Sequence, residues 1–416
     1  MTPRFLLLVC AVWPLRLAAQ HPITLDEAIR EARAANAELP VSALDVDVAR
    51  TLVREAQAGR RPRLSVESWA STGGPLAYTT SQGQALLVAG HTLLDGGLRR
   101  ANIEAGRHRI EVAGAGFRIA EKDLDLAVRL RFSELLKAEH EITFRRQGID
   151  RLRSYLSQIE GRKAAGQPVG SDVLTAQVRL GTEEATLADA DRALDEARLE
   201  LNDLMGRDPA GPLALAPLPP PTPPESLADT PWLTTPEVRQ AAASRAAAEA
   251  SIGATRAERR PLLSVSANVG VLPVFADSNA GTGLNSGSGF GGAVVLSLSW
   301  PIWNGGVYRA RLDRAQLEAQ QARNSQIAVQ RRSRLAWQVA AAQRVRLYQQ
   351  VQAWARNVPL ARDAYLQTES IYNGGAATTL EVLDAYAAWI NANEAYADAV
   401  LRYRLAEANS LRWGTP

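Results

Sequence analysis

The sequence has little of what most enzymes use at their active sites. Among 416 residues there are four histidines and a single cysteine, Cys10. No group of histidines and cysteines has the spacing of metal ligands, and no cysteine and histidine pair is available for covalent catalysis. No phosphate-binding glycine loop is recognisable either. The composition therefore predicts a protein that is not an enzyme and that uses no metal or cofactor.

The chain also lacks an excess of charge of one sign. It carries 47 positive and 44 negative residues, spread along its length, and its formal net charge is +3. This balance gives no reason to expect a nucleic-acid partner. Aromatic residues make up only 6% of the chain, and alanine supplies much of its hydrophobic content. Such a composition favours helices over β-sandwiches.

Residues 1–19 have the pattern of a secretory signal peptide. A basic start at Arg4 precedes an apolar run of about nine residues, too short to cross a bilayer, and small residues follow at Ala18 and Ala19. Val9 stands where a lipoprotein signal needs a small residue, so lipid attachment at Cys10 is not favoured. No later run of 18 or more residues is apolar throughout. An exported chain of this kind stays soluble or enters a membrane as strands.

The most informative feature is an internal repeat. The segment 61–66 matches 260–265, Asp95-Gly96-Gly97 matches 304–306, and Gly166 matches Gly375. The two halves, 20–206 and 237–416, are joined by residues 207–236, which hold ten of the 22 prolines. That proline content excludes a helix or a central strand, so the segment is predicted to be a linker.

Each half has the same order of predicted elements. A helix comes first, and in the first half Thr24 and Glu27 form a capping box at its start. Two strands and a long helical hairpin follow. At 1.5 Å per residue, the first helix of each hairpin spans roughly 100 Å. The predicted strands are 62–72, 84–94, 262–275 and 290–301, and the predicted hairpins are 98–204 and 307–412.

The strand segments alternate between apolar and small polar residues, as in Leu263, Val265 and Ala267 against the intervening serines. One interpretation is a pair of soluble hairpins packed on helices. The other is a membrane sheet, because 62–72 and 84–94 each have about the 9 to 11 residues that a tilted strand needs to cross a bilayer. Four strands cannot close a barrel, so the second interpretation requires several copies of the chain.

These features together resemble the TolC-like outer-membrane efflux protein family. The matching segments are 24–28, which looks like the family's opening helix, 300–306, which looks like its strand-to-helix junction, and 375–385, which is similar to its second periplasmic turn. The resemblance implies a mainly α fold with membrane β, in which long antiparallel hairpins form an α-barrel. It also implies a homotrimer whose strands build one twelve-stranded β-barrel.

The resemblance implies a function as well. Such a protein is the outer-membrane channel of a tripartite efflux or type I secretion system, located in the bacterial outer membrane with a long periplasmic extension. Its partners are the lipid bilayer, a periplasmic adaptor (membrane fusion protein) and an inner-membrane pump. Neither the transported substrate nor the pump class (RND, ABC or MFS type) follows from the sequence. The alternative is an exported soluble coiled-coil adaptor or scaffold, which leaves the duplicated strand pairs unexplained.

The resemblance places the periplasmic entrance at the two hairpin turns. Asp172 and Tyr372 match a pair that closes the entrance, although Asp172 could equally be the N-terminal acid of a helix. Glu381 and Asp384 match acidic positions that ring the lumen, with a solvated pair in a first helical turn as the alternative. The residues expected at the tips, where an adaptor would dock, are Arg162, Gly166, Gln167, Ser171, Gly374, Gly375 and Thr379. Three tryptophans near strand ends are expected to form an interfacial aromatic belt: Trp69, Trp300 and Trp303.

Overall fold

The computed structural model describes residues 21–73, 80–166, 170–224, 231–276 and 285–414. The predicted signal peptide with Cys10 lies outside the described residues, and so does Gln167. The helices are α1 Leu25–Ala35, α2 Glu38–Ala58, α3 Leu98–Ala164, α4 Gly170–Leu204, the short 3-10 helix η1 Pro231–Thr234, α5 Pro236–Ala257, α6 Val307–Asn373 and α7 Thr379–Gly414. The strands are β1 Arg63–Gly73, β2 Thr80–Leu94, β3 Leu262–Ala276 and β4 Asn285–Ser299.

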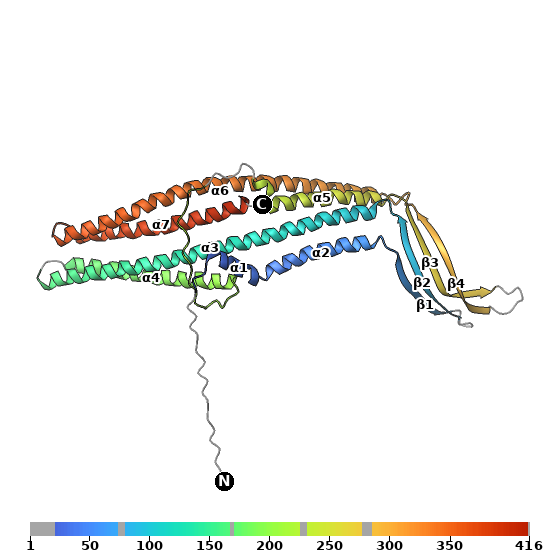
Figure 1. Ribbon diagram of the computed structural model, residues 1–416, viewed down its shortest axis with the longest axis horizontal. Helices are drawn as coiled ribbons and strands as arrows, with labels where there is room; N and C mark the ends of the chain where they lie inside the picture. Colours follow the sequence, from blue (N-terminus) through green and yellow to red (C-terminus); the bar gives the residue numbers. More distant parts are fainter. Residues whose placement is uncertain (1–20, 74–79, 167–169, 225–230, 277–284, 415–416) are drawn as a thin grey trace, which may run out of the picture. The chain divides into compact units, whose positions relative to one another are not determined.

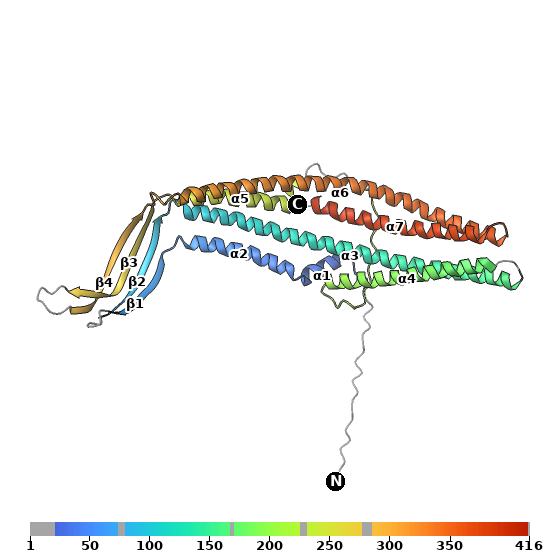
Figure 2. The same cartoon turned by 180° about the vertical axis from the view of Figure 1, so that it is seen from behind.

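The fold is mostly helical, with one antiparallel sheet, as the sequence predicts. Both halves contain a 67-residue helix, α3 and α6, followed by a shorter helix that runs back beside it (Figure 1). The view from behind shows the same neighbours, α3 beside α4 and α6 beside α7 (Figure 2). Pro359 lies inside α6 without ending it.

The compact units of the structure do not coincide with the sequence repeats. One unit comprises residues 1–36, 124–224 and 345–406, and the other comprises 37–123, 225–344 and 407–416. Each unit therefore contains parts of both repeats. The first holds the two hairpin turns, and the second holds the sheet.

The start of α1 confirms the predicted capping box. The backbone N–H of Glu27 donates to the Thr24 hydroxyl (3.3 Å), and the backbone N–H of Thr24 donates to the Glu27 carboxylate (2.9 Å). Two of the backbone donors at the helix start are satisfied in this way. The carboxylate remains charged more readily, because these hydrogen bonds hold the pKa of Glu27 below its usual value.

The repeated Gly-Gly pairs form matching turns from strand to helix. Gly96 and Gly97 have φ values of 63° and 94°, and Gly305 and Gly306 have 67° and 89°. Only glycine adopts such angles without strain. The preceding side chain caps each long helix: the Asp95 carboxylate accepts from the backbone N–H of Gly97 and Arg99, and Asn304 Oδ1 accepts from that of Tyr308.

The sheet has the strand order β1-β2-β3-β4, and every neighbouring pair is antiparallel. Because residues directly opposite each other point to the same face, the register assigns the faces across all four strands. Val66 pairs with Leu87, Leu87 with Val269, and Val265 with Leu296. One face is thus apolar from β1 to β4, while the other carries serines and Asn268.

Two strands, β2 and β4, begin earlier in the chain than the sequence predicts. β2 begins at Thr80 rather than at 84, and β4 begins at Asn285 rather than at 290. The added residues are polar or glycine, and they continue the ladder because the partner strands extend beside them. In the described chain, the outer edges of β1 and β4 have no strand partner.

Candidate functional site at the hairpin tips

The described parts of the two hairpin turns begin in the same way. Gly166 and Gly375 have φ values of 85° and 78° and follow the last turns of α3 and α6. The N–H of Gly166 donates to the carbonyl of Lys163, and the N–H of Gly375 to that of Tyr372. At the second turn the N–H of Ala376 also donates to the Ile371 carbonyl (3.1 Å), which completes a Schellman motif. Backbone hydrogen bonds therefore fix the second turn.

Tyr372 is buried between the two hairpins at this end of the chain. Its ring lies 4.6 Å from the Arg162 guanidinium carbon, and the same guanidinium donates to the backbone carbonyls of Tyr372 and Asn373. The Thr379 hydroxyl contacts the Tyr372 phenol at 3.4 Å. The ring of Tyr155 is 5.2 Å away. Tyr372, Arg162 and Thr379, which the sequence places separately at the tips, therefore meet in one cluster.

The Arg162 contact belongs to a regular series. In each case an arginine of the first hairpin lies over an aromatic ring of the second. The pairs are Arg151 over Trp389 at 5.3 Å, Arg162 over Tyr372 at 4.6 Å and Arg179 over Tyr386 at 5.7 Å. Each such cation–π contact contributes about 0.5–2 kcal/mol, depending on how dry it is. We call these three pairs the arginine–aromatic ladder.

The rings of the ladder pack on further aromatic residues. Trp389 stacks on Tyr365 with centroids 5.7 Å apart and 7° between the planes, and Phe144 meets its edge at 5.0 Å. Burial raises the pKa of Tyr365 to about 12. Burial likewise raises the pKa values of Tyr155 and Tyr386. All three phenols stay neutral across the physiological pH range.

A buried charge network joins three helices next to this cluster. The Arg145 guanidinium donates to Glu141 on α3, to Glu183 on α4 and to Glu394 on α7. The side chains of Arg145 and Glu183 are only 7% and 5% exposed. Arg179 makes a second contact with Glu183 at 3.0 Å. Arg145 is thus an electrostatic link between the two hairpins.

Burial has a clear effect on one carboxylate of this network. It raises the pKa of Glu394 above its usual value, although Arg145 acts in the opposite direction. No sequence pattern predicts this network directly. One signal was present, because Glu183 occupies a position of the α4 heptad where an apolar residue is expected. A charged residue in such a slot indicates a buried partner.

The first turn of α7 repeats the capping box of α1. The Glu381 carboxylate accepts from the backbone N–H of Thr378 (2.7 Å) and from its hydroxyl (3.0 Å). The Glu381 N–H in turn donates to the Thr378 hydroxyl. These hydrogen bonds, that from the Thr378 backbone above all, lower the pKa of Glu381. Within a single chain, Glu381 therefore caps the start of α7. Asp384 is exposed.

The remaining predicted residues are placed as follows. Asp172 is half-buried in the first turn of α4, and among the described residues no hydrogen bond joins it to Tyr372. Ser171 and Gly374 are exposed. Of the predicted aromatic belt, Trp69 is on β1, while Trp300 and Trp303 follow β4. All three are exposed in the single chain.

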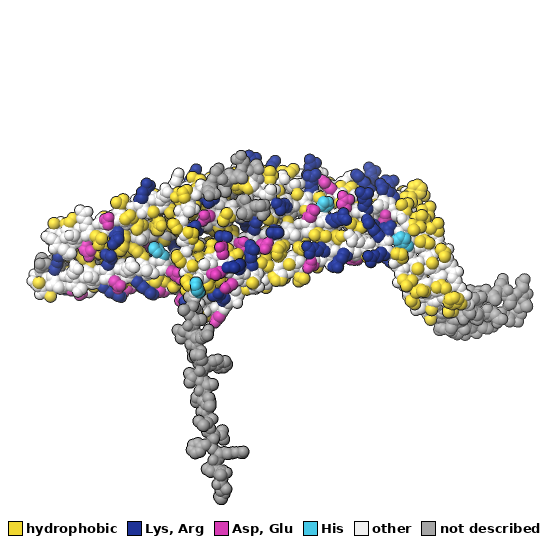
Figure 3. All heavy atoms as spheres, viewed as in Figure 1, with side chains coloured by type: hydrophobic (Ala, Val, Ile, Leu, Met, Phe, Trp, Pro, Cys, Tyr) yellow, Lys and Arg dark blue, Asp and Glu magenta, His cyan; other side chains and the backbone are white. Residues whose placement is uncertain are grey.

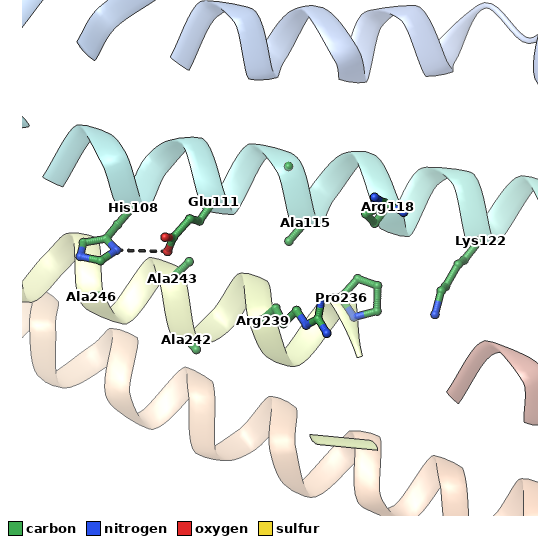
Figure 4. Close-up of a pocket in the computed structure, with 11 residues that line it drawn as sticks. His108, Glu111, Ala115, Arg118, Lys122, Pro236, Arg239, Ala242, Ala243 and Ala246 are labelled. Carbon is green, nitrogen blue, oxygen red and sulfur yellow. Dashed lines mark hydrogen bonds and ion pairs between the residues drawn. The ribbon is translucent and has the colours of Figure 1, made fainter. Parts of the chain in front are cut away.

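A separate cavity of about 690 Å³ lies between α3 and α5 (Figure 4). His108 contacts Glu111 there at 3.2 Å, and Arg118, Lys122 and Arg239 contribute positive charge. Burial lowers the pKa of Lys122. The cavity lacks a nucleophile paired with a base. Within the described residues, no group of three or more His, Cys, Asp or Glu could hold a metal ion.

None of the described helices contains an apolar stretch long enough to cross a bilayer. The pattern of two tip turns, two long hairpins and a sheet with one apolar face defines a class of channel proteins. The model of the family "Outer membrane efflux protein" matches residues 28–207 and again residues 233–412. The chain belongs to this family.

The match to known proteins extends to solved structures. VceC, an outer membrane protein from Vibrio cholerae, superimposes with a TM-score of 0.81 at 19% identity, covering 94% of this chain and 96% of that one. The open state of the Neisseria gonorrhoeae MtrE outer membrane channel gives a TM-score of 0.78 at 22% identity, covering 94% and 88%. These likenesses confirm the predicted fold.

A curated relative, Protein CyaE of Bordetella pertussis, is 27% identical over 243 residues. The aligned region is 55% of this chain and 48% of the relative. The chain thus spans about half the length of the curated relative that it matches.

The Arg145 network generates a prediction on stability. Arg145→Met would leave buried Glu183 with Arg179 alone and would take Arg145 away from Glu394, and we expect the free energy of unfolding to fall by about 3 kcal/mol. The control is Arg146→Met, because Arg146 pairs with Asp191 on the exposed surface and such pairs contribute about 1 kcal/mol or less. Unfolding of the detergent-purified full chain in denaturant measures the loss of stability in each of the two variants. Equal losses in the two variants would contradict the buried role of Arg145.

Proposed function

We propose that three copies of this chain form an exit duct that carries substrates from an inner-membrane pump across the periplasm and the outer membrane. Efflux and type I secretion are both compatible with this role. The chain belongs to the outer membrane efflux protein family. The observation that carries the proposal is its sheet, which has one continuous apolar face and, in the described chain, two edges without a strand partner. A soluble adaptor would have no use for such a sheet.

The edges argue for assembly. In hydrocarbon, an unpaired backbone N–H or carbonyl costs several kcal/mol, so an open sheet edge is not tolerated. The β1 edge of one copy can pair with the β4 edge of the next. Three copies would then close a twelve-stranded barrel with the apolar face outward. Trp300 and Trp303, which follow β4, would lie at the interface with the headgroups. Trp69 is on the opposite face of β1 from Val66 and would face the lumen.

The helical hairpins would form the periplasmic part of the duct. Their tips, with exposed Gly166 and Gly375, would meet the periplasmic adaptor. Gly374 and Ser171 are exposed beside them and would contribute to this contact. Arg162 and Thr379 would act indirectly, because both contact Tyr372 and fix the shape of the tip.

The membrane assignment is tested by a matched pair of arginine substitutions. Val294 and Val295 are neighbours on β4 that point to opposite faces, since Val294 pairs with Ala267 and Val295 with Ser266. Val294→Arg would place a charge in lipid at a cost of about 2–4 kcal/mol, while Val295→Arg would face the lumen. We expect only the first to reduce recovery of trimer from the outer-membrane fraction, measured by native mass in detergent.

The same fractions test the proposal as a whole. Wild-type protein recovered as a soluble monomer or dimer from the periplasm would refute the channel and restore the adaptor alternative. Equal recovery of both arginine variants would refute the assigned membrane face.

A second prediction concerns the entrance. In the closed duct, Asp172 and Tyr372 of neighbouring hairpins would restrain the tips, because a hydrogen bond from a phenol to a carboxylate is stronger than one between neutral groups. Asp172→Ala or Tyr372→Phe should raise single-channel conductance in a planar bilayer. Asp189→Ala, an exposed change on the same helix as Asp172, is the control. Unchanged conductance in both tip variants would contradict the proposal that these two residues close the entrance.

A third prediction concerns the acidic ring. Three copies of Glu381 and Asp384 would crowd carboxylates around the lumen and attract cations. Glu381→Gln keeps the capping hydrogen bonds, because glutamine also serves at this position of a capping box. Combined with Asp384→Asn, it removes the charge without opening the helix end. Cation block applied from the periplasmic side should be lost in this double variant, and block that persists would rule the ring out.

A further inference from the structure

Positive charge is concentrated where helices join strands. Four segments make these junctions, at residues 59–63, 95–109, 256–261 and 300–314, and all belong to one compact unit. Together they hold thirteen arginines and four acidic residues. The rest of the chain is left with 34 of the 47 positive and 40 of the 44 negative residues. We call the thirteen arginines the arginine collar.

Most of the collar is free of protein partners. Four of its members have a described side-chain contact: Arg99, Arg260, Arg311 and Arg314. The other nine are exposed, and none of their side chains has a hydrogen bond or ion pair within the described protein: Arg60, Arg61, Arg63, Arg100, Arg107, Arg109, Arg256, Arg259 and Arg309. These guanidinium groups are available to an external anion.

The collar borders the apolar face of the sheet. The surface view shows the positive side chains gathered at the helix ends, next to the hydrophobic surface of the strands (Figure 3). Trp300 comes two residues after Leu298, which lies on the apolar face, and its indole N–H donates to the Arg259 carbonyl at 3.2 Å. The apolar and cationic surfaces therefore meet within one or two residues along the chain.

A lipid leaflet has this combination of properties. Its hydrocarbon would cover the apolar face, and its phosphates would lie at the depth where the strands end. Guanidinium groups are weakly hydrated and bind phosphate oxygens in a bidentate manner. Basic residues beside a membrane segment attract anionic lipids over about one Debye length.

We infer that the arginine collar binds the phosphate headgroups of anionic phospholipids in the leaflet from which the helices emerge. The inference rests on the proposed function, because it requires the sheet to be in the membrane. It adds a lipid preference that an apolar belt alone does not produce, since hydrocarbon is the same in neutral and anionic lipids.

The experiment uses the full-length protein extracted from the outer-membrane fraction. The purified protein is offered equal amounts of phosphatidylglycerol and phosphatidylcholine, and native mass spectrometry counts the lipids of each kind that stay bound. We expect a preference for phosphatidylglycerol that weakens as salt is added. The preference for phosphatidylglycerol should fall by about tenfold in a variant with five collar substitutions. These are Arg60→Gln, Arg61→Gln, Arg100→Gln, Arg259→Gln and Arg309→Gln.

Two matched variants keep this test specific. The first removes the same number of exposed arginines without described partners elsewhere on α6: Arg323, Arg331, Arg346, Arg356 and Arg362, each to Gln. It should retain the preference. The second changes the five collar arginines to Lys, which keeps the charge but removes the bidentate contacts, so its preference should lie between those of the wild type and the Gln variant.

The following results would contradict the proposal that the collar binds anionic phospholipids. Equal loss in the α6 variant would mean that total charge is responsible. Loss of the trimer in the Gln variant but not in the Lys variant would make the collar a contact between protein chains. Displacement of the lipid by inorganic phosphate at equal phosphate concentration would mean that a free anion is bound. A wild-type trimer from the outer membrane without lipid preference would overturn the collar and leave the duct standing, whereas wild-type protein absent from that membrane would refute the duct itself.

Discussion

The hydrogen-bonding groups at the two edges of the sheet are the constraint on which the architecture depends. Four antiparallel strands present one apolar face, and that face is stable only against hydrocarbon or other apolar surface. Burying the face in lipid also exposes the edges of β1 and β4 to a medium without hydrogen-bond partners. A single chain cannot satisfy both requirements. Copies arranged in a ring satisfy them, and each copy must then bring its helices into the same ring.

Arginine serves two purposes in this chain. Between the hairpins it is turned inward, where Arg145 binds three carboxylates and the arginine–aromatic ladder holds rings of the partner hairpin. At the junctions with the sheet it is turned outward, and nine side chains have no partner among the described residues. The near-neutral net charge conceals this division, because it sums over both populations. Charge position, rather than net charge, is informative here.

The parts of the structure that are encoded locally could be predicted from the sequence. Alternating residues indicated the strands, the Thr24 and Glu27 pair indicated a helix start, and the duplicated Gly-Gly pairs indicated the turns. Interactions between distant segments could not be predicted. Arg145 has no local pattern that singles it out among the arginines of α3, and only the misplaced Glu183 hinted at a buried partner. Glu381 illustrates the opposite case, because its spacing to Thr378 is that of a capping box and the family resemblance drew attention away from it.

The arginine–aromatic ladder has a consequence for how such a chain can evolve. All three cations come from the first repeat and all three rings from the second. The two halves share one order of elements, but at these contacts they are complementary: one supplies the cations and the other the rings. A gene rearrangement that replaced either half with a copy of the other would preserve the backbone plan and lose every rung. At these three contacts, a change in one half removes an interaction unless the other half changes as well.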